Sequence, residues 1–456
     1  MTQIKRDDVV RHPASLVDSV GFVFAYENRV HRAINANSVE FFQELLDNRK
    51  PLEAAGLCPT KLSELTVEGA GLVVEHETLP FVTYPADWPS AMLARAAAFI
   101  CKLQLTLIPM GLSLKDGHPW NILWRGTQPV FVDWGSLTKS RPSAVFLDEV
   151  RNWLLFPLFL KRMGMHDAAR SFLLDVSKRP LESAEGQFFA SHLRLGAEAP
   201  QKKGFWKKSV SIDGEKFSDW IKQGSNVDSV KSQLQHIIAC IDNMPDSAKD
   251  TEWASYAGAD STHDHADQST WNLKTKNVYQ WLNRMKPKSV LDIGCNRGWY
   301  SQLARQNGAR VLALDIDETS LNTLFKLEQS ASDINIAVFD LANPTPSHGV
   351  AGAYSGTLEQ YSGDMIFALA ITHHLYFKRS MSFAAMAKSL EQMTAPGGVL
   401  IVEFIPADDV HVAKWVKPCH AGYTLANFVS EFKKQYTTVT VEPAYPDPRV
   451  LCICKK

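Results

Sequence analysis

The stretch that decides the fold is Val290-Leu-Asp-Ile-Gly-Cys-Asn-Arg-Gly-Trp-Tyr300. Its first residues form a short apolar run, typical of a buried strand, and its glycines mark a turn before a helical pattern. Gly294 and Gly298 place no side chain where a ligand would approach the backbone, and the start of the next helix supplies amide donors and positive potential. We therefore expect a strand, a glycine turn and a helix that together border a ligand site.

Two further acidic residues stand where the next two predicted strands end. Asp315 closes the apolar run that begins at residue 310, and Asp340 closes the run 336–340. Together with Asp292, these carboxylates would meet at the carboxyl edge of a parallel sheet, where open α/β folds bind ligands. A dinucleotide site would use Gly-x-Gly-x-x-Gly, whereas this chain has Asp-x-Gly-x-x-x-Gly. The Asp292 carboxylate disfavours a pyrophosphate and favours a ligand that carries an ammonium and a sulfonium group.

The rest of the C-terminal part alternates short apolar runs with helical patterns. This alternation predicts a parallel sheet that is covered by helices on both faces. The apolar runs are 334–339, 364–370 and 399–404, and two of the helical patterns are 381–393 and 425–436. Residues 437–441 and 450–454 flank a Pro-Asp-Pro turn and predict an antiparallel hairpin at one edge of the sheet.

Residues 270–456 resemble the class I S-adenosylmethionine-dependent methyltransferases, and the likeness extends to the turn Ala395-Pro-Gly-Gly-Val-Leu400. The resemblance implies an α/β fold with a Rossmann-like seven-stranded sheet whose last strand is antiparallel. It also implies S-adenosylmethionine as cofactor and transfer of its sulfonium methyl group to a nucleophile. The segment Trp253-Ala-Ser-Tyr256 is similar to a lid in this kind of enzyme.

The same resemblance assigns the parts of the cofactor to residues of this chain. Asp292, Gly294 and Gly298 would frame the methionine part, Asp315 the ribose and Asp340 the adenine. Four more residues complete the expected cofactor-binding set: Cys295, Ile316, Leu341 and Ala370. One alternative is a nicotinamide-dependent oxidoreductase. Another is a non-catalytic protein that keeps the pocket and binds the cofactor as a sensor.

Candidates for a general base follow the fourth and fifth predicted strands. They are His373 and His374, in Thr372-His-His-Leu, and Glu403. Methyl transfer is an in-line displacement at an activated carbon, so a base is needed only where the acceptor must lose a proton. An imidazole suits that role, although a His-His-Leu sequence also serves as pocket wall. No Asn/Asp-Pro-Pro-Tyr motif is present, which favours a small-molecule or glycan acceptor and transfer to an oxygen.

The first 200 residues predict a separate α+β unit. It would hold a hairpin over 21–34 and helices from Ser38, over 90–107 and over 144–175. Asp116 and Asn121 lie five apart in a loop before one strand, and Asp133 ends the next strand. In phosphoryl transfer the first acid can act on an acceptor hydroxyl, while the amide and the second acid hold magnesium on the nucleotide.

This arrangement resembles the aminoglycoside-phosphotransferase type of small-molecule kinase, but it departs from that family in two places. No glycine-rich phosphate loop precedes Gly21, and Arg32 stands where the family has a lysine. A guanidinium does not replace the compact charge of an ammonium. We therefore expect a degenerate kinase-like domain that binds the acceptor. The alternative is a bifunctional enzyme that also uses ATP and Mg²⁺, with Asp116 catalytic and Asn121 and Asp133 on the metal.

The expected organisation is a kinase-like domain over 1–200, a polar and helical linker over 201–265 and a methyltransferase domain over 266–456. This order resembles a bacterial group of nodulation-type methyltransferases. We interpret two features of the linker as solvated rather than functional. They are the basic cluster Lys202, Lys203, Lys207 and Lys208, and the segment His263-Asp-His265, which offers two imidazoles but no third ligand in register.

Composition excludes several other classes of protein. The 456 residues carry 48 Lys and Arg against 49 Asp and Glu, so the net charge of −1 implies no general affinity for nucleic acid. The longest apolar run, 153–160, is too short for membrane insertion, and the polar residues 1–11 are unlike a signal peptide. The seven cysteines are an odd number without CxxC spacing, which predicts a cytoplasmic protein.

Overall fold

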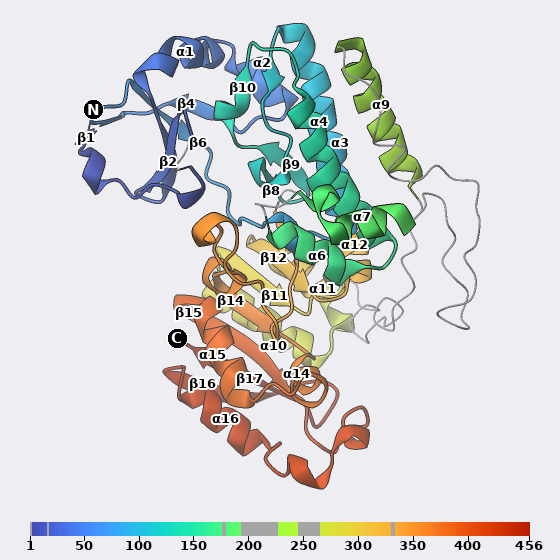
Figure 1. The fold of residues 1–456 in the computed structure, drawn as a ribbon. Coiled ribbons are helices and arrows are strands. Elements are labelled where there is room, and N and C mark those ends of the chain that lie inside the picture. The colour runs from blue at the N-terminus through green and yellow to red at the C-terminus, as the bar shows by residue number, and fades with distance from the viewer. Residues whose placement is uncertain (1, 16–17, 176–178, 193–226, 245–264, 330–332) are drawn as a thin grey trace.

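The computed structural model describes residues 2–15, 18–175, 179–192, 227–244, 265–329 and 333–456 (Figure 1). The suggested lid Trp253–Tyr256, the four lysines of the linker and His263 lie outside these residues. The described chain forms a front half, up to residue 244, and a C-terminal half from residue 265. Figure 1 shows the two halves stacked one above the other.

The C-terminal half contains one seven-stranded sheet, as the sequence predicts. The strand order is β13-β12-β11-β14-β15-β17-β16, and β17 is antiparallel to both of its neighbours. The strands are β11 (Ser289–Ile293), β12 (Arg310–Asp315), β13 (Ile334–Val338), β14 (Gly363–Ala368), β15 (Thr394–Phe404), β16 (Thr438–Pro443) and β17 (Val450–Lys455). The expected terminal hairpin is β16–β17, and it forms one edge of the sheet.

Both faces of this sheet are buried, which explains its nearly continuous apolar strands. In β11, Val290 packs into one hydrophobic cluster while Leu291 and Ile293 pack into another on the opposite face. Helices α10 (Leu273–Met285), α11 (Trp299–Gln306) and α12 (Glu318–Leu327) contribute to the first cluster. Helices α14 (Thr372–Arg379), α15 (Phe383–Met393) and α16 (Leu425–Lys433) contribute to the second, next to the short α13 (Thr357–Gln360).

The front half is built around a four-stranded antiparallel sheet and a group of helices. The sheet order is β2-β3-β6-β4, and β1 pairs with β5, β7 with β10 and β8 with β9. The strands are β1 (Thr2–Ile4), β2 (Gly21–Tyr26), β3 (Arg29–Ile34), β4 (Thr60–Leu62), β5 (Leu65–Val67), β6 (Leu72–His76), β7 (Ser113–Leu114), β8 (Ile122–Arg125), β9 (Gln128–Phe131) and β10 (Leu137–Thr138). The helices are α1 (Val39–Asp47), α2 (Arg49–Ala55), α3 (Ser90–Leu107), α4 (Ala144–Val150), α5 (Phe156–Arg162), α6 (His166–Leu174), α7 (Ala184–His192) and α9 (Val227–Asn243).

Local sequence explains where several front elements begin and end. The β2–β3 hairpin turns at Glu27 and Asn28, whose φ angles of 48° and 60° match a two-residue turn of the primed type. The helical region expected over 144–175 is divided. A π-helical segment, Arg151–Leu155, joins α4 to α5, and Gly164 with φ of 77° separates α5 from α6.

The two halves share a hydrophobic cluster and several buried polar contacts. Helix α3 contacts α12 across the junction, and Asn322 on α12 bonds to Ser90 Oγ and to the Ala91 amide, both at 2.9 Å. Lys161 on α5 pairs with Glu318 at the start of α12, and the Lys161 side chain is only 1% exposed. The two halves therefore pack against each other through a shared core that also buries an ion pair and amide contacts.

Helix α9 belongs to the front half by its packing, although the sequence places it in the linker. It contacts α3, and its Ile241 carbonyl accepts a hydrogen bond from Arg162 Nη1 at 3.1 Å. Among the described residues, Ser90–Met110 is one helix that is long and apolar enough to cross a bilayer. That segment is α3 together with the 3-10 turn Ile108–Met110 that follows it, and α3 lies in the core with Met92, Ala96 and other side chains fully buried.

Candidate cofactor site

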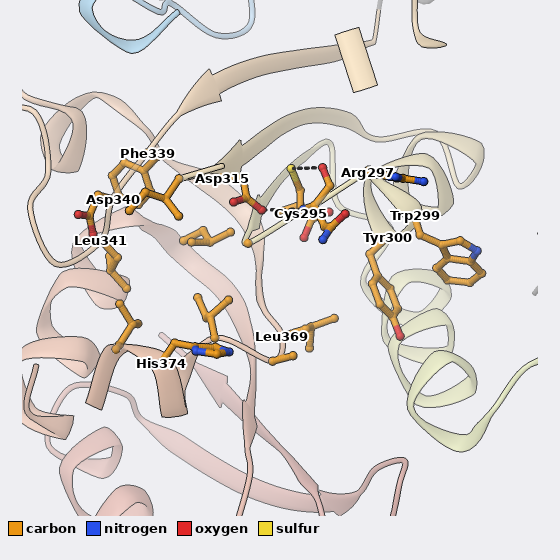
Figure 2. Close-up of a pocket in the computed structure, with 18 of the residues that line it drawn as sticks. Cys295, Arg297, Trp299, Tyr300, Asp315, Phe339, Asp340, Leu341, Leu369 and His374 are labelled. Carbon is orange, nitrogen blue, oxygen red and sulfur yellow. Dashed lines mark hydrogen bonds between the residues drawn. The ribbon is translucent and has the colours of Figure 1, made fainter. Parts of the chain in front are cut away.

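A cavity of about 400 Å³ opens at the carboxyl ends of the parallel strands. Its lining comes from the start of α10, the glycine turn after β11, and the residues that follow β12, β13 and β14 (Figure 2). All of the lining residues lie between Lys274 and Arg379, so the front half contributes none. Eight of the nine predicted cofactor residues line the cavity: Asp292, Gly294, Cys295, Asp315, Ile316, Asp340, Leu341 and Ala370.

The glycine turn uses its two glycines for different purposes. Both have left-handed backbones, with φ of 79° at Gly294 and 80° at Gly298. A Cβ at Gly294 would lie 2.3 Å from Cγ2 of Ile371, which lines the cavity. A Cβ at Gly298 would instead lie 2.6 Å from Cδ1 of Leu324 on α12. Gly298 is absent from the lining, so its conformation and packing, rather than ligand contact, account for the glycine.

Asp292 is a buried carboxylate at the end of β11. It is 3% exposed, and its Oδ2 accepts a hydrogen bond of 2.6 Å from Ser301 Oγ. Burial raises the pKa of Asp292 to about 7, and the nearby Asp315 carboxylate adds to the rise. Such a group takes up a negative charge only at a cost, which a cationic ligand in the cavity would offset.

Asp315 ends β12 and is held by backbone amides of two neighbouring turns. Its Oδ2 accepts from the Asn296 amide at 2.7 Å and its Oδ1 accepts from the Asp317 amide at 2.8 Å. Burial raises the pKa of Asp315 to about 6 despite these bonds. Burial, together with the Asp315 and Asp292 carboxylates, raises the pKa of the Cys295 thiol well above its usual value. The Ile316 amide is a third backbone donor, and since a carboxylate offers about four acceptor positions, Asp315 can still accept from a ligand hydroxyl.

The opposite end of the cavity is largely apolar. Ile316 is 53% exposed there, although it is a large aliphatic residue, and Phe339 and Leu341 complete the wall. Asp340 forms an ion pair with Arg379 and accepts a hydrogen bond of 2.9 Å from the Ala342 amide. This end therefore combines apolar surface with one carboxylate, which suits a heteroaromatic ring with an exocyclic amino group.

The two candidate histidines point to different surroundings although they are adjacent in sequence. His374 lines the cavity, and burial together with Lys378 lowers its pKa to about 4. His373 is not part of the lining; its ring stacks on Trp415 with a centroid distance of 5.6 Å and an interplanar angle of 14°. Burial and the charge of neighbouring groups lower the pKa of His373 to about 2. Of the two, His374 is the one placed to face a bound ligand.

Glu403 lies behind the cavity rather than in its lining. It is fully buried, and its Oε2 accepts a hydrogen bond of 2.9 Å from the Ala370 amide and lies 3.6 Å from Lys274 Nζ. Arg449 Nη1 lies 4.0 Å from the other carboxylate oxygen. Ala370 has a left-handed backbone with φ of 56°, a strained conformation for alanine. Glu403 thus fixes the wall of the cavity and has no access to an acceptor.

Sequence reasoning missed several lining residues at the glycine-turn end. Trp299 and Tyr300 come from the first turn of α11. Their position directly after Gly298 could have been used to predict that they line the cavity. Lys274 comes from the first turn of α10 and had no motif around it. His265, from the segment considered as a metal ligand, stacks on Trp299 at 4.2 Å. Within the residues that the structure describes, no group of three metal-binding side chains occurs.

The front constellation differs from the one that a magnesium nucleotide needs. Arg32 Nη2 lies 2.5 Å from Asp133 Oδ1, which also accepts from the Gly135 amide at 3.0 Å. The same guanidinium pairs with Asp18, again at 2.5 Å, and its side chain is 5% exposed. A buried cation already bound to Asp133 opposes a divalent ion there. Asp116 and Asn121 lie in the loop between β7 and β8, as expected. The ion pair of Arg32 with Asp133, however, does not favour a metal site beside them.

Comparison with known proteins agrees with the geometry of the C-terminal half. Residues 267–438 match a protein family described as "Methyltransferase domain". Nodulation protein NoeA of Rhizobium meliloti (strain 1021) is 27% identical over 423 residues, which cover 89% of this chain and 87% of NoeA.

Two solved structures show weaker similarity. N-methyltransferase NodS from Bradyrhizobium japonicum WM9 is 16% identical with a TM-score of 0.28, over 40% of this chain and 96% of NodS. The bifunctional kinase-methyltransferase WbdD is 15% identical with a TM-score of 0.30, over 40% of this chain and 38% of WbdD. These two similarities carry no argument about activity. The family match and the seven-stranded sheet agree with each other: residues 267–438 are similar to a methyltransferase domain.

Proposed function

We propose that the chain transfers a methyl group from S-adenosylmethionine to an oxygen of a small-molecule or glycan acceptor. The observation that carries this proposal is the convergence of Asp292, Asp315 and Asp340 on one cavity at the strand ends. Two of the three have raised pKa values because they are buried, so the cavity suits a cationic ligand that bears hydroxyl donors. The match of residues 267–438 to a methyltransferase family supports the same reaction.

The residues present fit this cofactor part by part. Asp315 would accept from the ribose hydroxyls with the lone pairs that the backbone amides leave free. Ile316, Phe339 and Leu341 would pack on the adenine, and Asp340 would accept from its amino group. Asp292 would face the methionine part, where the positive charge of the ligand would favour the ionised carboxylate. Lys274, which lines the cavity beside Tyr300, would attract the methionine carboxylate.

When bound, the cofactor supplies a methyl group that its sulfonium has already activated. The chain would then contribute mainly alignment, because the rigid cavity wall at Ala370 is held by buried Glu403. As the acceptor oxygen bonds to the methyl carbon and the carbon–sulfur bond breaks, the hydroxyl proton must leave. His374 faces the cavity and, with a lowered pKa, is neutral near pH 7 and able to accept that proton. Its pKa of about 4 makes it a weak base, so alignment would contribute more to the rate than proton transfer.

The front half would bind the part of the acceptor that lies beyond the methylated group. It contributes no residue to the cofactor cavity, so any direct contact that it makes in the reaction would be with the acceptor. The pairing of Arg32 with Asp133 gives no support to a second activity with ATP and Mg²⁺. Free cysteines at all seven positions agree with the cytoplasmic location that we propose.

The direct test is incubation of the purified chain with a cell extract of its host and cofactor labelled in the methyl group. We expect label in a small or carbohydrate-containing product, and none with the variant Gly294→Val. Absence of any labelled product, together with tight cofactor binding, would instead support the sensor. Label in protein or nucleic acid would contradict the proposed acceptor class.

A further inference from the structure

A cluster of cationic and aromatic side chains continues from the cofactor cavity onto the surface. It joins α14 to the segment 410–420, which follows β15. The ring of Trp415 lies 5.1 Å from that of His374, which lines the cavity. Lys378, which also lines the cavity, places its Nζ 4.8 Å from the centre of the Trp415 ring, and Lys414 places its Nζ 5.8 Å away. The cluster thus begins where the cofactor site ends.

The two segments that form this cluster contain no acidic residue. Helix α14 reads Thr372-His-His-Leu-Tyr-Phe-Lys-Arg379, and residues 410–420 read Val-His-Val-Ala-Lys-Trp-Val-Lys-Pro-Cys-His. Among them are three lysines, one arginine and four histidines. The nearest preceding buried acid, Asp409, already accepts a hydrogen bond of 2.9 Å from Arg449 Nε. Arg379 pairs with Asp340, which lies outside both segments, and neither segment supplies an acid of its own.

Trp415 lies near both ammonium groups. One of its faces is stacked on His373, and cation–π attraction holds both lysines near the same ring. Two like charges at one ring repel each other, and an anion that contacts both would remove this repulsion. Both lysines are exposed at the surface, unlike Lys274, which is buried beside Glu403.

We infer that the methyl acceptor carries an anionic group, a phosphate or a carboxylate, and that Lys378 and Lys414 bind this group beside Trp415. The inference rests on the proposed methyl transfer and names the chemical class of its acceptor. The anion would sit at the mouth of the cavity, on the side of His374, so that the acceptor oxygen can enter while the charge stays at the surface. The Asp292 and Asp315 carboxylates, which line the cavity, would disfavour the anion inside it.

The charge of the acceptor can be tested before the acceptor is identified. A host cell extract is separated on an anion exchanger at neutral pH into unbound and salt-eluted fractions, and each is incubated with the chain and methyl-labelled cofactor. We expect labelled product from the salt-eluted fraction. Product from the unbound fraction alone would overturn the inference and leave the proposed methyl transfer standing. No product from either fraction, or from their mixture, would overturn both. Phosphatase treatment of the active fraction then distinguishes a phosphate, whose removal abolishes labelling, from a carboxylate.

Variants connect that result to the cluster. Lys414→Gln, whose side chain is outside the cofactor cavity, should raise the acceptor KM at least about 10-fold and leave the cofactor Kd unchanged. Lys378→Gln should raise the acceptor KM by a similar factor. Lys388→Gln removes an exposed lysine of α15 on the same domain and serves as the matched control, with no change expected. Equal KM values for Lys414→Gln and Lys388→Gln would overturn the assignment of the site.

Discussion

The two halves of the molecule place acidic residues at strand ends in the same way, yet they surround them differently. In the C-terminal half, Asp292 and Asp315 border a cavity and keep raised pKa values because burial outweighs the hydrogen bonds that they accept. In the front half, Asp133 is bound by the buried guanidinium of Arg32. The sequence alone does not show whether an aspartate is available to a ligand or is already paired with a cation of the same chain. The residues that surround each aspartate in the folded chain determine whether it can bind a ligand.

The halves also depend on each other. Asp315, which lines the candidate cofactor cavity, is followed closely by α12, whose first residue is Glu318. Glu318 pairs with Lys161 of the front half and lies 3.0 Å from His166 Nδ1. The front half therefore anchors the helix that begins directly after the turn at Asp315, even though it contributes no side chain to the cavity. Its clearest contribution is structural support of the cofactor site.

The largest expected effect comes from filling the glycine turn. Gly294→Val would push a side chain against Ile371 and force a left-handed backbone on valine, so cofactor affinity should fall more than roughly 100-fold. Gly397→Val carries the same backbone strain, with φ of 73°, but its Cβ meets open space. Calorimetric titration of both variants separates the two causes. Equal loss of affinity in both would mean that strain alone is responsible and that the turn does not border the ligand.

The second-largest effect is expected on stability, when the ion pair between the two halves is broken. Lys161→Met would leave the buried Glu318 without its ammonium partner and should lower the free energy of unfolding by about 3–5 kcal/mol. Urea denaturation measures this change, and Lys388→Met is the matched surface control. The double variant Lys161→Met with Glu318→Leu should recover part of the loss. A single variant as stable as the parent would show that the halves are not joined through this pair.

The raised pKa of Asp292 predicts a dependence of stability on pH. The folded pKa of about 7 lies above the usual value of 3.8, so the folded state holds a proton that the unfolded state releases between these values. Without cofactor, the parent should lose up to about 4 kcal/mol of stability as pH rises from about 4 to about 8. Asp292→Asn should lack this loss, whereas Asp447→Asn in the exposed hairpin turn should retain it. Parallel pH profiles for parent and Asp292→Asn would contradict the assignment.

A smaller effect is expected when Asp315, the proposed acceptor of the ribose hydroxyls, is replaced. Asp315→Ala should weaken cofactor binding by about 1–3 kcal/mol, or roughly 5- to 150-fold, because two hydroxyl groups lose their acceptor. Asp317→Ala is a useful comparison, since Asp317 caps α12 without lining the cavity. Isothermal titration with the cofactor product measures both. If Asp317→Ala loses as much affinity as Asp315→Ala, the ribose contact has been assigned to the wrong acid.

The smallest expected effect concerns the acid of the front half. Asp133→Ala should not change the rate of methyl transfer at saturating acceptor, because Asp133 serves its ion pair with Arg32 and not the cofactor cavity. Titration of the parent with ATP and Mg²⁺ should produce no saturable heat. Nucleotide binding that Asp133→Ala abolishes would restore the bifunctional alternative.

Much of the C-terminal fold could be predicted because its determinants are local in sequence. The apolar strands, the glycine turn and the acids after three successive strands each carry their own signal, and the topology of a parallel sheet brings the acids together. The network behind Ala370 could not be predicted in this way. Its charged residues, Lys274, Glu403 and Arg449, are far apart in the chain and meet only after folding.

The direction in which a side chain points from its helix or turn could not be predicted from the sequence either. His373 and His374 are neighbours on one helix, about 100° apart around its axis, so both rings contact Trp415 but only His374 lines the cavity. Gly298 carries the same signal as Gly294, but its missing side chain makes room for Leu324. The pairing of Arg32 with Asp133 joins residues 101 apart, so the sequence alone could indicate the unusual arginine but not its partner.

The most direct test of the central claim is calorimetric titration of the purified full chain with S-adenosylmethionine. We expect one saturable site per chain, competition by S-adenosylhomocysteine, and loss of binding in Gly294→Val with Gly397→Val unaffected. No binding of either sulfur nucleoside, with saturable binding of a nicotinamide dinucleotide at the same site, would contradict the claim.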